Sequence, residues 1–138
     1  MNNVFILDAC ALIAFLANED GSDKIEEILR NAIEEKISLK INQINLLEVY
    51  YYVYNFYGQN EANRALEKIK EFPIEIKIGL NIDGFKEAGR IKSKYKIPLG
   101  DSIAIAECII EKGTLITSDR SDFEKVGNTE NIKIYWFR

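Results

Sequence analysis

Histidine is absent from this chain of 138 residues. Without an imidazole the chain cannot hydrolyse substrates through Ser-His-Asp or Cys-His arrangements, nor cleave RNA with paired histidines, and most kinds of zinc site are also excluded. Any hydrolytic chemistry must therefore depend on carboxylates, lysines, hydroxyls or a metal ion held by oxygen ligands.

Cysteine is scarce, and no apolar run approaches the length of a transmembrane helix. Cys10 and Cys108 lie in apolar helical patterns of a chain that reads as cytosolic, so we interpret both as small buried hydrophobic residues and not as a disulfide. The first residues lack the basic region of a signal peptide and meet an acid at Asp8, which is more typical of a buried strand. We therefore expect a cytoplasmic protein with no membrane segment.

The composition is that of an ordinary globular protein, with 47% hydrophobic and 29% charged residues, and the length predicts one domain over residues 1–138. The net charge of −4 argues weakly against a general nucleic-acid binder. If five acids surround a bound metal, however, the remaining 17 acids nearly balance the 18 basic residues. The charge therefore does not exclude a nucleic-acid substrate.

Apolar strand patterns alternate with helical patterns along the chain. Strands are expected at residues 4–7, 37–41, 74–78, 114–117 and 132–137. Helices are expected at residues 9–17, 22–35, 42–57, 60–71, 81–94 and 101–112, with none between the last two strands. Strands separated by helical crossovers predict an α/β fold, with a mostly parallel central sheet and helices on both faces.

Within residues 98–123, the predicted topology brings two acids to the same edge of the sheet. Pro98 and Gly100 are expected to interrupt the preceding structure, and Asp101 then lies in the first turn of a helix that leads into strand 114–117. Such a helix runs antiparallel to its strand, so its start lies at the same edge of the sheet as the end of the strand. Asp101 and Asp119 should therefore meet at the carboxyl edge, where open α/β sheets place their sites.

Other acids are expected at this edge. Asp8 follows the first strand, and Glu48 lies two turns into the helix after the second strand, with apolar neighbours. Each acid alone has an ordinary explanation: Asp8 caps a helix, Glu48 lies on a helix surface, and Asp119 and Asp122 form a turn. Together, these acids cannot all remain ionised without a cation, and hard oxygen ligands favour Mg²⁺ or Mn²⁺.

The sequence excludes several other α/β phosphate enzymes. It contains neither G-x-x-x-x-G-K-[ST] nor G-x-G-x-x-G. A phosphatase of the haloacid dehalogenase type requires an Asp where Cys10 stands, and a response-regulator receiver requires an acceptor Asp where the third strand leads into Gly79.

At these residues the chain resembles the PIN domain family, and in particular the small VapC-type toxin ribonucleases. The matching segments cover nearly the whole chain: the strand that ends in Asp8-Ala9, NLLEV at 45–49, LGDSIAIA at 99–106 and LITSDRSDF at 115–123. The resemblance implies a PIN-like three-layer sandwich and an Mg²⁺- or Mn²⁺-dependent endoribonuclease, the toxin of a type II toxin–antitoxin system. It also implies a homodimer, an RNA substrate and a small cognate antitoxin whose tail covers the acidic site.

The resemblance also assigns roles to residues. It implies that the metal is held by Asp8, Glu48, Asp101 and Asp119, with Asp122 as an additional acid, and that Thr117 or Ser118 supplies a nearby hydroxyl. The chain departs from the family at Ala9, where Thr or Ser is frequent, and at Asn42, where a hydroxyl residue is frequent.

Two other classes of function remain open from the sequence. One is a catalytically silent PIN-like module that binds RNA or protein, and the other is an α/β metal-dependent phosphatase with Asp8 as a covalent nucleophile. The helix at 42–57 is rich in tyrosine, which we interpret as core and dimer interface rather than as a surface for stacking bases.

Overall fold

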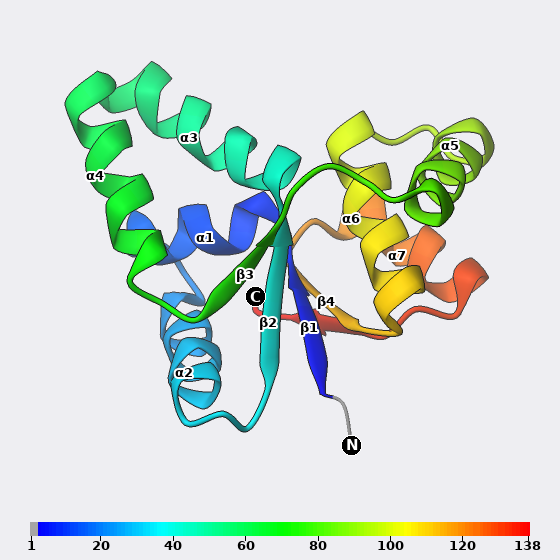
Figure 1. Ribbon diagram of the computed structural model, residues 1–138, viewed down its shortest axis with the longest axis horizontal. Coiled ribbons are helices and arrows are strands. Elements are labelled where there is room, and N and C mark those ends of the chain that lie inside the picture. Colours follow the sequence, from blue (N-terminus) through cyan, green and yellow to red (C-terminus); the bar gives the residue numbers. More distant parts are fainter. Residues whose placement is uncertain (1–2) are drawn as a thin grey trace.

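The computed structural model describes residues 3–138, and within them it contains five strands and seven helices. The strand order across the sheet is β3-β2-β1-β4-β5, and every pairing is parallel. The strands are β1 (Val4–Leu7), β2 (Ser38–Asn42), β3 (Ile74–Lys77), β4 (Thr114–Thr117) and β5 (Ile134–Trp136). Helices lie on both sides of the sheet (Figure 1), which confirms the prediction of an α/β three-layer fold with a parallel sheet.

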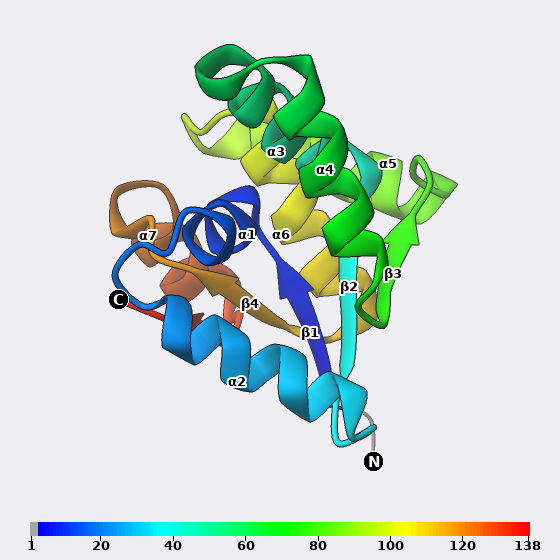
Figure 2. The ribbon, with the colours of Figure 1, turned by 90° about the vertical axis from the view of Figure 1, so that its left-hand side faces the viewer.

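The helices divide between the two faces of the sheet. They are α1 (Ala9–Leu16), α2 (Ser22–Ile33), α3 (Gln43–Tyr57), α4 (Gln59–Lys70), α5 (Ile82–Lys94), α6 (Leu99–Glu111) and α7 (Arg120–Glu130). Figures 1 and 2 show α1 and α2 on one face, with the α3–α4 pair on the same side, and α5 to α7 on the other face. Among the described residues, no helix is long and apolar enough to cross a membrane.

The central strand β1 is buried on both faces, as its continuous apolar sequence predicts. Leu7 packs in the core beneath α1 and α2, whereas Val4 and Ile6 pack in the core beneath α5 to α7. The register pairs Leu7 with Ile116 of β4, and the amide of Asp8 donates to the carbonyl oxygen of Ile116 at 3.2 Å. The ends of β1 and β4 therefore lie side by side, so that Asp8 stands next to Thr117.

The expectation that no helix lies between the last two strands is wrong, because α7 occupies that interval. Asp119 caps this helix, and its Oδ1 accepts from the backbone amide of Asp122 at 3.2 Å. Phe123 and Val126 bury their side chains one helical turn apart, and Asn131 ends the helix in the left-handed conformation. The polar run that precedes Phe123 resembles a turn in sequence, but it is the capped start of a helix.

Both cysteines are free, so the prediction that they form no disulfide is confirmed. Cys108 is a buried core residue as expected, with 2% exposure. Cys10 is only half-buried, and its thiol donates to Asp8 Oδ2 at 3.2 Å, so its interpretation as a buried hydrophobic residue is wrong.

Candidate metal centre

Four acids from four parts of the fold line one hollow at the carboxyl edge of the sheet. Asp8 follows β1, Glu48 lies on α3, Asp101 lies in the first turn of α6, and Asp119 follows β4. The hollow has a volume of about 220 Å³, and Cys10 and Tyr51 also line it. The sheet-edge argument therefore places these side chains correctly, although they are up to 111 positions apart in the sequence.

A tighter group overlaps this arrangement; it adds Asp122 and does not include Asp8 or Glu48. Asp101, Asp119 and Asp122 each offer a carboxylate oxygen, and these oxygens lie within 4.8 Å of one another. Asp119 and Asp122 are half-buried, whereas Asp101 is buried. Three carboxylates at this separation repel one another when ionised, and a divalent cation is the partner that removes the repulsion.

Asp101 is the acid of this group whose surroundings least favour the ionised form. Its side chain is 8% exposed, and its Oδ2 atom is buried without any hydrogen-bond donor. Burial, followed by the neighbouring Asp122 and Asp8 carboxyls, raises the pKa of Asp101 to about 9. A buried carboxylate oxygen without a donor is costly in a metal-free protein, and a bound cation satisfies it.

Asp8 is held in a fixed orientation. Its Oδ1 accepts from the amide of Ala9 at 2.8 Å, and its Oδ2 accepts from the Thr117 hydroxyl at 3.0 Å and from the Cys10 thiol. Burial raises the pKa of Asp8 to about 6, although these hydrogen bonds act in the opposite direction. The three hydrogen bonds hold the Asp8 carboxylate in one orientation relative to the hollow.

The two predicted supporting residues lie next to these acids. Besides donating to Asp8, Thr117 Oγ1 accepts from the backbone amide of Asp119 at 3.1 Å, so one hydroxyl connects two of the acids. The Ser118 hydroxyl is directed at Cys10 Sγ, 3.9 Å away. Thr117 therefore has the more direct contact with the acids.

Glu48 has surroundings that differ from the expectation. Its apolar neighbours Ile44 and Leu47 are 39% and 52% exposed, so they do not enclose the carboxylate. Instead, Asn45 Nδ2 donates to Glu48 Oε1 at 3.1 Å, and the carboxylate lies against the backbone of Gly100. Two other apolar neighbours, Val49 and Tyr52, are buried and half-buried, so the apolar surroundings of Glu48 are only partial, and its position at the acidic hollow agrees with the prediction.

Comparison with protein families assigns the fold. The PIN domain model matches residues 5–128. The chain belongs to the PIN domain family.

Solved VapBC structures are similar to this chain. VapBC2 from Rickettsia felis, bound to a promoter DNA fragment, is 17% identical, with a TM-score of 0.74 over 96% of this chain and 97% of that chain. DNA-bound VapBC from Salmonella typhimurium is 14% identical, with a TM-score of 0.74 over 100% of both chains. VapBC-1 from nontypeable Haemophilus influenzae is 15% identical, with a TM-score of 0.72 over 97% of this chain and 98% of that chain. No curated protein sequence matches this chain.

Three residues at this PIN-domain site were not predicted from the sequence. The Cys10 thiol donates to Asp8 Oδ2, and Asn45 and Gly100 contact the Glu48 carboxylate. The sequence signals for Asn45 are its polarity on a helix of mostly apolar residues, one turn before Glu48, and its place in the NLLEV segment of the family resemblance. Gly100 gives a misleading signal, because it is interpreted as a helix breaker but lies inside α6.

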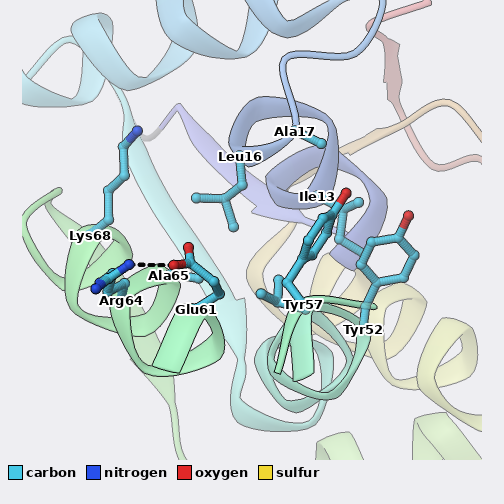
Figure 3. A pocket seen from close by; sticks show the side chains of 10 residues that line it. Ile13, Leu16, Ala17, Tyr52, Tyr57, Glu61, Arg64, Ala65 and Lys68 are labelled. Carbon is cyan, nitrogen blue, oxygen red and sulfur yellow. Dashed lines mark hydrogen bonds and ion pairs between the residues drawn. The ribbon is translucent and has the colours of Figure 1, made fainter. Parts of the chain in front are cut away.

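A larger groove adjoins the acidic hollow of the PIN domain. It lies between α1, α3 and α4 and has a volume of about 440 Å³ (Figure 3). Its floor includes Leu16 and Val53, and its rim carries Lys68 and the ion pair between Arg64 and Glu61. Ile13 and Tyr52 line both the groove and the acidic hollow, so the two cavities are neighbours.

Proposed function

We propose that this chain is a metal-dependent endoribonuclease of PIN type, and the toxin component of a type II VapBC-like toxin–antitoxin system. In this proposal residues 1–138 form a single nuclease domain that acts in the cytoplasm. The observation that carries the proposal is the convergence of separate acids on one hollow, with Asp101 Oδ2 buried there without a donor.

The side chains of the hollow fit Mg²⁺ or Mn²⁺, because their carboxylate oxygens are the hard ligands that these ions prefer. In the proposal the ion is held by Asp8, Glu48, Asp101, Asp119 and Asp122. When bound, the ion supplies an activated water and stabilises the charge that develops on the phosphate. The chain itself orients the ligands, through Thr117 and Ala9 at Asp8 and through the N-terminus of α7 at Asp119.

Attack by water rather than by the neighbouring 2′-hydroxyl of RNA predicts products with a 5′-phosphate and a 3′-hydroxyl. The absence of histidine agrees with this route, because cleavage by the 2′-hydroxyl in proteins commonly uses imidazoles as acid and base. The phosphatase alternative is less favoured, because a haloacid dehalogenase-type site needs a second Asp where Cys10 stands.

We also propose an antitoxin partner. One solved structure that is similar to this chain is titled a toxin–antitoxin complex, from Klebsiella pneumoniae, and three others are titled as VapBC. An antitoxin segment that lies in the groove of Figure 3 can reach the acidic hollow along the surface that Ile13 and Tyr52 share. A basic side chain of its tail would then replace the metal among the carboxylates.

We further propose that the chain forms a homodimer. Leu47 and Ile78 are 52% and 73% exposed and line one shallow cavity. These residues support the proposed dimer, whose test is the molecular mass in solution.

The decisive test is cleavage of a pool of single-stranded and structured RNA in the presence of Mg²⁺, Mn²⁺ or EDTA. We expect cleavage with either ion, none with EDTA, and none with Asp8→Asn. Asp23→Asn, which changes an exposed acid in the first turn of α2, should cleave like the unmodified protein.

Other results of this assay would contradict the proposal. Products that end in a 2′,3′-cyclic phosphate would exclude attack by water. RNA binding without cleavage under any condition would favour the silent binding module, and turnover of phosphomonoesters without RNA cleavage would favour the phosphatase.

A further inference from the structure

Asn45 lies one helical turn before Glu48 on α3 and is fully buried, with 0% exposure. Its Nδ2 donates two hydrogen bonds, one to Glu48 Oε1 at 3.1 Å and one to the carbonyl oxygen of Gly100 at 3.0 Å. Both partners are acceptors only, so the amide nitrogen must face them and the side chain cannot be reversed. Asn45 therefore joins α3 to the first turn of α6.

The other end of the same amide has no partner. Asn45 Oδ1 is buried without a hydrogen-bond donor. An unpaired buried carbonyl lowers the stability of the protein, and an apolar side chain of similar volume would avoid that cost. The contribution to stability therefore does not explain why position 45 is an asparagine. The two bonds that Asn45 donates, to Glu48 and Gly100, do explain it.

Gly100 completes the contact. A Cβ atom on this residue would lie 2.6 Å from Glu48 Oε2 and 2.7 Å from Glu48 Oε1. The carboxylate therefore lies directly against the backbone of α6, immediately before Asp101. The amide of Asn45 and the bare backbone of Gly100 together determine where Glu48 stands relative to Asp101.

We propose that Asn45 is a positioning residue, which holds the Glu48 carboxylate and the start of α6 in the arrangement that binds a divalent cation. The inference rests on the proposed metal site and adds a residue that the resemblance to VapC-type proteins did not assign. Partners that orient metal ligands typically change metal affinity by about 10- to 100-fold when they are removed.

The test measures binding of Mn²⁺ alone, by calorimetry and without RNA. Asn45→Leu keeps the number of side-chain heavy atoms and removes both donated bonds, and Asn45→Asp keeps the shape and removes the donors. We expect each variant to bind Mn²⁺ about tenfold more weakly than the unmodified protein.

Asn42→Ala is the matched control. Asn42 is also fully buried at the start of α3 and makes three hydrogen bonds, to the Ile44 amide, the Gly79 carbonyl and Glu107, but none to Glu48 or Gly100. We expect this variant to lower the melting temperature at least as much as Asn45→Leu while leaving Mn²⁺ affinity within about twofold. This pattern separates positioning from a general loss of stability.

Glu48→Gln distinguishes failure of the inference from failure of the proposed function. If Glu48→Gln weakens Mn²⁺ binding but folded Asn45→Leu and Asn45→Asp do not, the inference is wrong and the metal site stands. If the unmodified protein does not bind Mn²⁺, the proposed function fails first and the inference fails with it. Equal weakening in Asn42→Ala and Asn45→Leu would also overturn the inference.

Discussion

Asp101→Asn should abolish metal-dependent RNA cleavage and, at the same time, make the metal-free protein more stable. The carboxylate that the substitution removes lies buried beside Asp122, with one oxygen lacking a donor. At pH 8 the folded protein must keep on Asp101 a proton that the unfolded chain releases; an amide avoids this cost but is lost as a proposed metal ligand. We expect cleavage to fall by more than about 100-fold, since the loss of a ligand should exceed that of a residue that orients one. The melting temperature without metal at pH 8 should rise by about 3 °C or more.

The Asp101 carboxyl also makes the stability of the metal-free protein depend on pH. The pKa of Asp101 rises from 3.8 to about 9 because of burial, followed by the neighbouring carboxyls, so between these values the folded protein retains a proton that the unfolded chain releases. The free energy of unfolding of the metal-free protein therefore decreases as the pH rises from about 4 toward 9. Asp8, whose pKa burial raises to about 6, adds to the decrease at the acidic end of this range.

Melting temperatures in EDTA at pH 5 and pH 8 measure this effect. We expect a clear decrease in the unmodified protein and a smaller one in Asp101→Asn. Mn²⁺ at pH 8 should restore stability to the unmodified protein but not to the variant, because a ligand that binds only the folded state raises its stability. Asp83→Asn is the matched control, since it changes an exposed acid in the first turn of α5. If Asp101→Asn cleaves as well as the Asp83→Asn control, Asp101 is not a metal ligand.

The position of the acids could be predicted because it depends on topology. Asp8 and Asp119 follow β1 and β4, and in a parallel sheet the ends of all strands lie at one edge. Asp101 follows by the same reasoning, since α6 must run back along the sheet before β4 begins. These steps use only the order of the elements, which apolar patterns in the sequence reveal well.

The contacts between the acids could not be predicted in the same way. The amide of Asn45 reaches the carbonyl oxygen of Gly100, 55 positions later, only because α3 packs against α6 at one particular distance. Sequence patterns give the face on which a residue lies, but not the distance between helices. The missed helix α7 has a related cause, because the polar residues that cap a helix are also those that favour turns.

At Gly100 the helix propensity of the residue and its observed position disagree. Glycine is unfavourable inside a helix, which is why the sequence suggests a break at this position, yet Gly100 lies in the first turn of α6. The structure gives the reason, because any larger residue would place its Cβ atom on the Glu48 carboxylate.

Gly100→Ala should therefore reduce function without reducing stability. The three atoms nearest to the added methyl group belong to the carboxylate end of Glu48, a flexible side chain that can move aside. Alanine also stabilises a helix relative to glycine, by up to about 1 kcal/mol. We expect an unchanged or higher melting temperature, Mn²⁺ binding weakened several tens of fold, and RNA cleavage reduced to a similar extent.

Gly89→Ala provides the control for Gly100→Ala. Gly89 lies within α5, and a Cβ atom there would meet nothing within 4 Å. The same substitution should therefore give a similar gain in stability with no change in Mn²⁺ affinity or cleavage. If Gly100→Ala instead lowers the melting temperature in proportion to its loss of Mn²⁺ affinity, the close approach of α3 and α6 serves packing rather than the placement of Glu48. If both variants bind Mn²⁺ equally well, the position of Glu48 against Gly100 does not matter for the metal.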